Sequence, residues 1–526
     1  MIKKIFLILL LPVVMIGQEN QGIELPDFVI TGERKVSIPT AKKKKAKPIS
    51  ILSKEFFTPV KSPEEFSLSK MSKPDILDTN ITLKKSPYNG SLYLGAGINT
   101  MPIGEFNYNT GSRHVLFSAS VFGSDEREYI DNAGYNVSGA SLGADFFISS
   151  KSSFIPGSRI RLSGDFIRDE YNLYGAILPN QNRKTQSGSV SIGLTNEYSN
   201  YINYGFGFDI NSFSAEEDNN LKENLVKGEG YLKIFFDRFS VKTTGEIITQ
   251  DYSSDIAVKN DDSYLKLNAR ADLKPIKDLN VSFGFNYSKL GSQNQFVPNV
   301  VLSAKLANGL AIFGEYAPGS EFLTTRDFLS ANRYYKINGV QSLFTKHTSN
   351  IKAALKYEYL RFFEVNGGFG TMNSDNAGYF TFVGGEHQFR IANDISRVNL
   401  FVNLLFHLGS YGRLYGSINY DKSSLANDNT VPNMPGYYSD IIYGLNLNEK
   451  FDIETKLSLK SKIYSDETNS IKSPSFINFA VSLKYKFTKG LNFIADLNNL
   501  LNRDNFLIYN FEEKPLDAVI GIEYRW

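Results

Sequence analysis

From about residue 89 to its end, the chain consists of short runs in which apolar and polar residues alternate, with turn residues between the runs. Residues 279–288 are one such run, with Leu, Val, Phe, Phe and Tyr at every second position and Asn, Ser and Gly between them. Successive side chains of a β-strand point to opposite faces, so each run forms a strand with one apolar and one polar face. Runs of about ten residues can cross a bilayer as tilted strands. The pattern therefore predicts an all-β fold, a large antiparallel transmembrane β-barrel.

A soluble β-sandwich shows the same alternation, but its polar face is the outside. The aromatic content favours the membrane barrel, because the 526 residues include 40 Phe and 30 Tyr and many apolar faces end in one of the two. Membrane barrels carry such residues in girdles at both lipid–water interfaces. After the N-terminal segment no stretch of about 18 apolar residues occurs, so no membrane-spanning helix is predicted.

The connections between the runs alternate in length, as in barrels with short periplasmic turns and long outer loops. Short turns lie at 198–200, 237–239, 274–278, 307–309, 448–450 and 488–490. Long connections lie at about 169–186, 212–228, 316–345, 421–436 and 498–516. We expect about 22 strands and an even total, as bacterial single-chain barrels have. The alternation fails in the region 372–396, so one strand there is expected to be split or spurious.

Residues 1–18 have the organisation of a secretory signal peptide. Lys3 and Lys4 supply positive charge, residues 5–16 form an apolar stretch, and Gly17 is a small residue near a plausible cleavage point. A membrane anchor is the other interpretation, but this stretch is too short to span a bilayer. The chain contains no cysteine, so disulfides and Cys-ligated zinc are excluded. We expect an integral protein of the bacterial outer membrane.

Residues 19–88 are predicted to form a short, extended periplasmic arm ahead of a barrel domain that comprises residues 89–526. Lysines cluster at positions 42–45 and 47, and prolines fall at 26, 39, 48, 59, 63 and 74. This composition is typical of extended segments without a packed core. The Lys-rich linker is either solvated or in contact with acidic lipid headgroups or a partner.

The segment 23–34, Ile-Glu-Leu-Pro-Asp-Phe-Val-Ile-Thr-Gly-Glu-Arg, follows the predicted cleavage point. It resembles the TonB box of TonB-dependent outer-membrane receptors, a short β-prone stretch that often ends in Thr-Gly. In that family the box pairs as an added strand with TonB, a periplasmic energy-transducing protein, which is a form of β-augmentation. The resemblance implies that a TonB-type protein binds Asp27, Phe28, Val29, Ile30 and Thr31.

Three further stretches resemble the same family. Residues 316–323, followed by Tyr334 and Tyr335, are similar to a Pro-containing mid-barrel loop with an aromatic-rich continuation. Residues 491–502 are similar to the penultimate strand and its Asn-rich exit. The final strand ends in a C-terminal aromatic residue and resembles the assembly signal of outer-membrane barrels. That signal implies recognition of Ile520, Ile522, Tyr524 and Trp526 by the barrel-assembly machinery.

The sequence departs from the family between the box and the barrel. Family members carry a folded plug domain there, whereas residues 33–88 are too few, too charged and too rich in proline to form one. A barrel of this size has a wide lumen that is normally filled. We therefore expect a lumen-filling partner, a reduced plug, or lumenal side chains and infolded loops.

The resemblance implies uptake of a scarce or bulky ligand across the outer membrane, such as an iron chelate, cobalamin, an oligosaccharide or a peptide. One alternative is a plugless scaffold or partner-gated barrel that anchors another protein, and a passive porin-like channel is another. Four aromatic residues of the 316–345 loop either stack on a ligand or pack the loop over the mouth. They are Phe322, Phe328, Tyr334 and Tyr335.

No constellation of residues indicates an enzyme. The four histidines, His114, His347, His387 and His407, lack metal-ligand spacing. Acidic clusters such as residues 216–218 are either solvated or bind Ca²⁺. The net charge is +2 and no basic domain indicates binding to nucleic acid. We therefore expect no enzymatic activity, no cofactor and no bound metal.

Overall fold

The computed structural model describes residues 89–526, apart from positions 238, 256–259, 338 and 361. The predicted signal peptide (1–18) and the predicted arm (19–88), which includes the TonB-box-like segment, lie outside the described residues. Within the described part, β-strands form nearly all of the regular structure.

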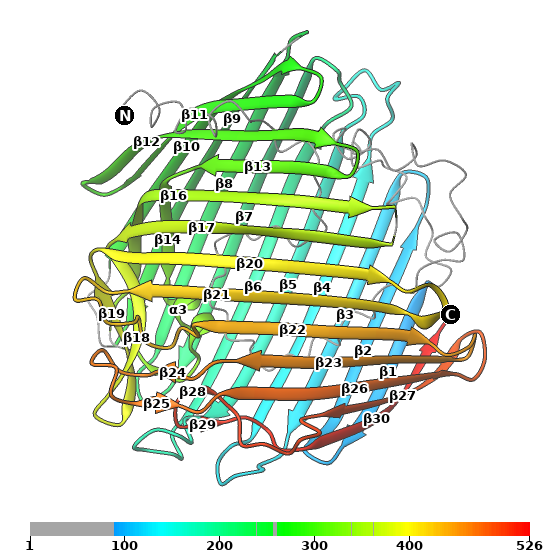
Figure 1. The fold of residues 1–526 in the computed structure, drawn as a ribbon, viewed down its shortest axis with the longest axis vertical. Coiled ribbons are helices and arrows are strands. Elements are labelled where there is room, and N and C mark those ends of the chain that lie inside the picture. Colours follow the sequence, from blue (N-terminus) through cyan, green and yellow to red (C-terminus); the bar gives the residue numbers. More distant parts are fainter. Residues whose placement is uncertain (1–88, 238, 256–259, 338, 361) are drawn as a thin grey trace, which may run out of the picture.

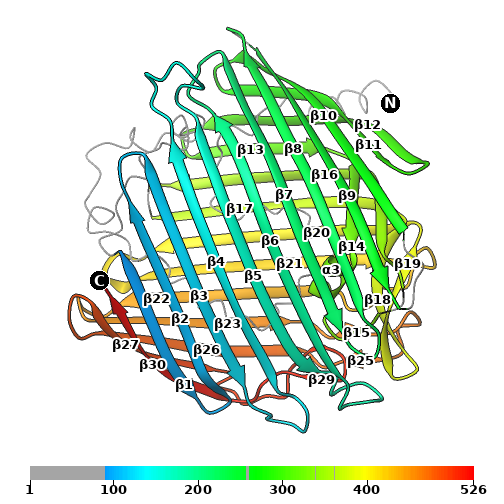
Figure 2. The same cartoon turned by 180° about the vertical axis from the view of Figure 1, so that it is seen from behind.

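Twenty-two antiparallel strands close into a barrel (Figures 1 and 2). They are β1 (Gly90–Gly97), β2 (Thr100–Gly111), β3 (Val115–Glu126), β4 (Tyr135–Phe147), β5 (Arg159–Asn172), β6 (Asn182–Asn196), β7 (Ile202–Glu216), β8 (Leu221–Phe235), β9 (Phe239–Ser254), β10 (Asn260–Ile276), β11 (Leu279–Leu290), β12 (Gln293–Ala307), β13 (Leu310–Tyr316), β16 (Ser342–Tyr359), β17 (Phe363–Asp375), β20 (Ile395–His407), β21 (Arg413–Ser424), β22 (Tyr437–Asn446), β23 (Phe451–Lys460), β26 (Phe476–Lys486), β27 (Leu491–Asn498) and β30 (Asp517–Arg525). β1 pairs with β30, from Ser91 opposite Arg525 to Gly97 opposite Val519, and this pairing closes the sheet. The predicted fold class and strand number are confirmed.

Apolar side chains cover the outer surface of the barrel. In β11, Phe283 and Phe285 are 50% and 44% exposed, whereas Asn280 and Ser282 on the other face are buried. At the C-terminus, the four residues of the proposed assembly signal are all exposed on this outer face: Ile520, Ile522 and Tyr524 of β30, and Trp526 directly after it. A surface of exposed aliphatic and aromatic side chains is the one that lipid requires.

The two rims of the barrel differ in their connections. Short turns such as 198–200 and 488–490 lie at the rim that also holds Trp526, whose backbone accepts hydrogen bonds from Asn89 and Gly90. Short turns mark the periplasmic rim of such barrels. The connections at the opposite rim include 425–436 and 499–516, which are the outer loops. The protein is therefore an integral outer-membrane barrel, as predicted.

Strand occupies most of one predicted long connection and half of another. β7 continues to Glu216 and β8 starts at Leu221, so paired backbone replaces most of the connection predicted at 212–228. β5 and β6 likewise pair as far as Asn172 and Asn182. The alternation of apolar and polar residues ends where these strands leave the lipid, because the two faces of a strand no longer differ in environment there. The backbone pairing nevertheless continues.

The alternation of short and long connections fails in the region 372–396 because this region contains a hairpin outside the barrel. β18 (Ala377–Val383) and β19 (Glu386–Ala392) join the short β15 (Tyr335–Lys336) in a separate three-stranded sheet. The other elements of the outer loops are β14 (Gly319–Thr324), α3 (Thr325–Ala331), β24 (Ile463–Tyr464), β25 (Lys472–Ser473), β28 (Phe506–Ile508) and β29 (Phe511–Glu512). Figure 1 shows α3 and these small sheets gathered at the end of the barrel away from the C-terminus. No helix among the described residues has the length and apolar character needed to cross a membrane.

Glycines let aromatic rings pack onto the backbone at the seam between β1 and β30. Tyr93, which is 3% exposed, lies against Gly521, where an added Cβ would meet its ring at 2.3 Å. At the periplasmic rim, a Cβ on Gly90 would meet the Trp526 indole at 2.5 Å. Both rings therefore add packing to the hydrogen bonds of the closing strands, and a larger residue at either glycine would displace them.

The assignment of faces predicts that a new charge costs stability on one side of a strand only. Val190, 66% exposed, and Ser189, which donates a hydrogen bond to Asp165, are neighbours on opposite faces of β6. Val190→Lys is expected to lower the free energy of unfolding by about 2–4 kcal/mol, the cost of lysine near the bilayer midplane. Ser189→Lys should have little effect because its ammonium lies beside Asp165 in the lumen. Urea unfolding in lipid vesicles measures both, and equal destabilisation would contradict the assignment.

Candidate ligand-binding site

The outer connection 317–341 folds into the barrel rather than away from it. β14 continues from β13 and pairs with β16. It runs over the inner faces of β10 and β11: Phe322 stacks on Tyr264 with 5.4 Å between ring centroids, and Asn286 donates a hydrogen bond to the Pro318 carbonyl at 2.8 Å. Both wall residues face the lumen. The connection therefore occupies lumenal space near the outer rim.

α3 continues this inward path and packs on the inner faces of β7 and β9, the strands on either side of β8. The backbone N–H of Thr324 donates to the Asp327 carboxylate at 3.0 Å, which satisfies a donor at the start of the helix. Phe328 and Leu329 are buried in a cluster with Phe213 of β7, and Tyr252 of β9 belongs to the same cluster. Burial of these side chains provides the apolar part of the attachment.

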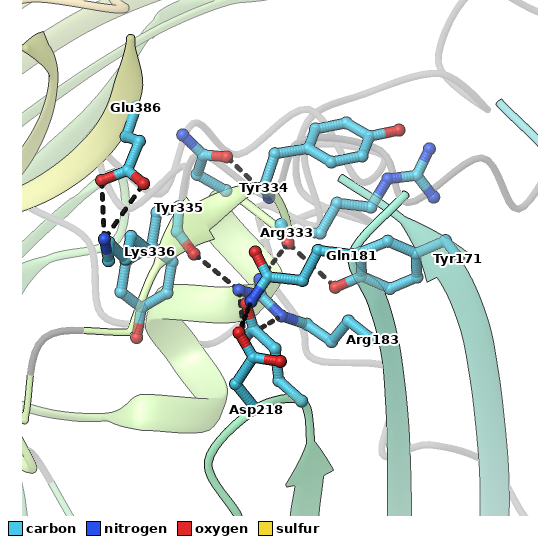
Figure 3. Close-up of polar contacts among 11 residues, drawn as sticks. Tyr171, Gln181, Arg183, Asp218, Arg333, Tyr334, Tyr335, Lys336 and Glu386 are labelled. Atoms are coloured by element: carbon cyan, nitrogen blue, oxygen red, sulfur yellow. Dashed lines mark hydrogen bonds and ion pairs between the residues drawn. The ribbon is translucent and has the colours of Figure 1, made fainter. Parts of the chain in front are cut away.

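Arg183 of β6 provides the polar part. Its side chain is fully buried and donates hydrogen bonds to the backbone carbonyls of Arg333, at 2.6 Å, and Tyr335, at 3.0 Å (Figure 3). Its charge is balanced by Glu217, at 2.7 Å. The Tyr171 hydroxyl donates to the same Arg333 carbonyl at 2.9 Å. A buried guanidinium is stable only when its charge and its N–H groups are matched, as they are here.

The side chain of Arg333 connects this loop to a second one. Its guanidinium carbon lies 4.6 Å from the ring centroid of Tyr135, 5.5 Å from that of Tyr171 and 4.9 Å from that of Tyr334. Tyr334 in turn stacks on Phe511 of the 499–516 loop, with centroids 3.8 Å apart and an angle of 10°. Cation–π contacts of this kind gain strength where water is excluded.

The outer loops meet one another at the 499–516 loop. Tyr129 and Tyr174, from two other outer loops, donate hydrogen bonds to the Glu512 carbonyl at 2.8 and 2.6 Å. His387 of β19 donates through Nε2 to the Tyr509 carbonyl at 2.8 Å. Loops that start at separate points of the rim therefore form one connected layer across the outer mouth.

A cavity of about 540 Å³ lies within this layer. Its size is in the range of sites for small organic ligands. The walls combine apolar, aromatic and charged side chains from six outer connections. The residues that line it are Leu173, Ala176, Leu178, Gln181, Glu217, Asp218, Asn219, Leu221, Ser254, Asp255, Tyr334, Lys336, Ile337, Gly385, Glu386, His387 and Phe511.

Carboxylates outnumber cations in the lining of this cavity. Lys336 forms an ion pair with Glu386 at 2.9 Å. The Asp218 carboxylate accepts a hydrogen bond from the neutral amide of Gln181 at 2.8 Å (Figure 3). Asp255 accepts one from the backbone N–H of Asn220 at 2.9 Å. These neutral donors stabilise the carboxylates without cancelling their charge.

His387 lies in the cavity wall and is 1% exposed. Because Nε2 donates to a carbonyl, the imidazole is the tautomer whose Nδ1 is a hydrogen-bond acceptor. Nδ1 is buried and has no hydrogen-bond partner among the described residues. Burial lowers the pKa of His387 to about 4, so the ring is neutral at physiological pH.

The structure separates the four aromatic residues predicted as candidates for ligand binding. Tyr334 lines the cavity. Phe328 and Tyr335 are buried in the apolar cluster that attaches the loop, and Phe322 stacks on the barrel wall. Packing of the loop over the mouth therefore accounts for these three, and ligand contact by Tyr334 stays a prediction.

The other predicted sites have a simpler outcome. Asp27, Phe28, Val29, Ile30 and Thr31 lie outside the described residues, and recognition of the C-terminal strand by the assembly machinery stays a prediction. No group of three or more His, Asp or Glu side chains in the described part of the chain could hold a metal ion.

Sequence reasoning missed the site residues Arg183, Lys336 and His387. The acidic cluster at 216–218 was the one local sign of this cavity, since Glu217 and Asp218 both line it.

Loss of Arg183 is expected to free the 317–341 loop. Arg183→Met leaves the carbonyls of Arg333 and Tyr335 and the Glu217 carboxylate without their buried partner, a change that typically costs about 3–5 kcal/mol. Trypsin should then cleave the loop in proteoliposomes about tenfold faster or more, because cleavage follows the population of the open loop. Arg168→Met is the control. It removes an exposed ion pair between Arg168 and Glu170, which both lie on β5, the strand next to β6. Equal cleavage of both variants and the wild type would contradict this role.

No protein-family model and no curated protein matches the sequence. The structure, however, is similar to solved transport receptors. The ferric-catecholate import receptor of E. coli K12 is 10% identical, with a TM-score of 0.62 over 84% of this chain and 82% of that chain. The iron transporter of Neisseria meningitidis is 10% identical, with a TM-score of 0.67 over 85% and 83%. A copper transporter is also 10% identical, with a TM-score of 0.65 over 83% and 80%. The chain thus has the barrel fold of TonB-dependent outer-membrane receptors.

Proposed function

We propose that the protein takes up a scarce or bulky ligand across the outer membrane and captures it first in the cavity between the outer loops. The observation that carries this proposal is the connected layer of loops at the outer mouth of a receptor-like barrel, with a ligand-sized cavity inside it. A ligand bound there contacts the 317–341 loop through Tyr334 and Lys336. Binding can therefore alter the contacts that hold this loop, and the loop acts as the gate.

Energy for opening is proposed to come from a TonB-type protein that pairs with Asp27 to Thr31. Proteins of this barrel fold include import receptors for iron chelates and a copper transporter, so uptake is a function that the fold serves. An extended segment with alternating side chains suits strand addition. Force on the arm reaches the barrel where the arm joins β1.

A scaffold that anchors another protein is the alternative, because the segment between the box and the barrel is short. A scaffold needs a stable partner and no moving gate. The two functions therefore differ in whether the TonB-box-like segment is used and whether the barrel opens.

Val29→Pro is expected to abolish binding of the TonB-type protein while the barrel still assembles, because proline removes the backbone donor that an added strand requires. Site-specific crosslinking from position 28 to the periplasmic domain of the TonB-type protein measures this. Ala41→Pro, in the same arm but outside the box, is the matched control. Crosslinking that survives Val29→Pro would contradict the proposed role of the segment.

If the 317–341 loop is the gate, the purified protein should have a low conductance in a planar bilayer, both as the full-length chain and after removal of residues 19–88. Arg183→Met should raise the conductance, because it releases the loop from β6, whereas Arg168→Met should not. A large and steady conductance of the wild-type protein would mean a passive channel and would overturn gated uptake. A closed barrel that opens only on removal of the arm would place the gate in the arm.

A further inference from the structure

We propose that Glu223 of β8 makes the attachment of the 317–341 loop depend on pH, so that the loop is held more tightly in acid than at mildly alkaline pH. This inference rests on the proposed role of the loop as the gate and adds a control of that gate by protons. Three features of Glu223 carry it: its contacts with the loop, the burial of its carboxyl group, and the absence of a cation beside it in the described part of the chain.

Glu223 holds the loop at the start of α3. Its Oε2 atom accepts a hydrogen bond from the backbone N–H of Thr325 at 3.0 Å and a second from the side-chain amide of Gln250 of β9 at 3.1 Å. Gln250 also donates to the carbonyl of Gln341, at the other end of the same loop, at 3.1 Å. One carboxyl group therefore fixes α3 to the wall, next to the point where the chain enters β16.

The carboxyl group of Glu223 is removed from water. The residue is 1% exposed, and its second oxygen, Oε1, is buried without a hydrogen-bond partner among the described residues. On the wall Glu223 lies between Phe213 of β7 and Tyr252 of β9, which both belong to the apolar cluster around Phe328. An ionised carboxylate is costly in this position, because nothing replaces the water that Oε1 loses.

No positive side chain offsets this cost. The titratable groups near Glu223 are Asp327 of α3, Tyr252 of β9 and Tyr335 of β15, and none of them carries a positive charge. The negative charge of Asp327 instead opposes ionisation of Glu223. The attached loop therefore favours the neutral, protonated form of this carboxyl group.

The outer end of β8, where Glu223 lies, is beyond the lipid, since Lys222 and Asn224 are exposed on the outer face at this level. Burial raises the pKa of Glu223 from its usual value near 4.5 to about 7, and Asp327 adds to this shift.

The attached and the released loop therefore differ in their affinity for a proton. Once the loop leaves, water reaches the carboxyl group of Glu223, and its pKa returns toward the usual value. A group whose pKa is higher in the attached state stabilises that state fully at pH values below about 4.5, and the contribution is lost as the pH rises through about 7. The loop should thus open more easily at pH 8 than at pH 6.

Glu223→Gln is the variant that tests this switch. Its amide oxygen can accept both hydrogen bonds that Oε2 accepts, and its NH2 group takes the place of Oε1, so the contacts remain and the titration is lost. Trypsin cleavage of the loop in proteoliposomes is measured for the wild type and the variant at several pH values between 6 and 8. The ratio of the two rates removes the pH dependence of trypsin itself.

The ratio of the wild-type rate to the Glu223→Gln rate is expected to rise about fivefold to tenfold between pH 6 and pH 8, because cleavage follows the population of the open loop. Glu170→Gln is the matched control. The carboxylate of Glu170, on β5, is paired with Lys184 at 3.2 Å, and its loss should leave the wild-type pH dependence unchanged. A ratio that stays constant or falls with pH would overturn the switch, and so would an equal loss of pH dependence in Glu170→Gln.

Conductance separates this inference from the proposed gate. Wild-type protein in a planar bilayer should open about fivefold to tenfold more often at pH 8 than at pH 6, whereas Glu223→Gln should open equally often at both. If the cleavage ratio changes with pH and the frequency of opening does not, the switch exists and the loop is not the gate. If the cleavage ratio is constant while Arg183→Met still raises the conductance, the loop is the gate and the switch is absent.

Discussion

Closure of the sheet between β1 and β30 is the constraint on which the rest of the structure depends. In lipid, each unpaired backbone N–H or C=O group costs several kcal/mol, so a sheet that spans the membrane cannot have an edge. The chain meets this condition by bringing its first and last strands together, with Tyr93 packed over Gly521 at the seam. All other strands can then expose apolar side chains to lipid without exposing their backbone.

Closure with this number of strands also creates the problem that the outer loops solve. A ring of 22 strands encloses a lumen too wide for the wall's own side chains to fill. Here the 317–341 loop enters the lumen and is attached to the wall at two separate places, by pairing with β16 and through Arg183 of β6. The attachment combines an apolar cluster around Phe328 with a fully buried ion pair, so it is both stable and geometrically specific.

The sequence predicts the barrel well and the site poorly, for one physical reason. Lipid imposes a period of two on every strand, and that period is visible in residues 279–288 without any knowledge of partners. Outside the lipid no such period is imposed: Ile463 continues the alternation of β23 in the sequence, yet β23 ends at Lys460 and Ile463 is buried in the small sheet of β24. The contact between Arg183 and the Arg333 carbonyl joins residues that are 150 positions apart and involves a backbone acceptor. No local sequence pattern therefore predicts it.

The acceptors that hold the outer loops together are mostly main-chain carbonyls. Arg183 binds the carbonyls of Arg333 and Tyr335, Tyr129 and Tyr174 bind that of Glu512, and His387 binds that of Tyr509. A carbonyl is present whatever side chain its residue carries. Lys336 and its neighbours can therefore change identity during evolution while the path of the loops is preserved. Ligand preference can diverge among descendants of this barrel without rebuilding the layer that closes it.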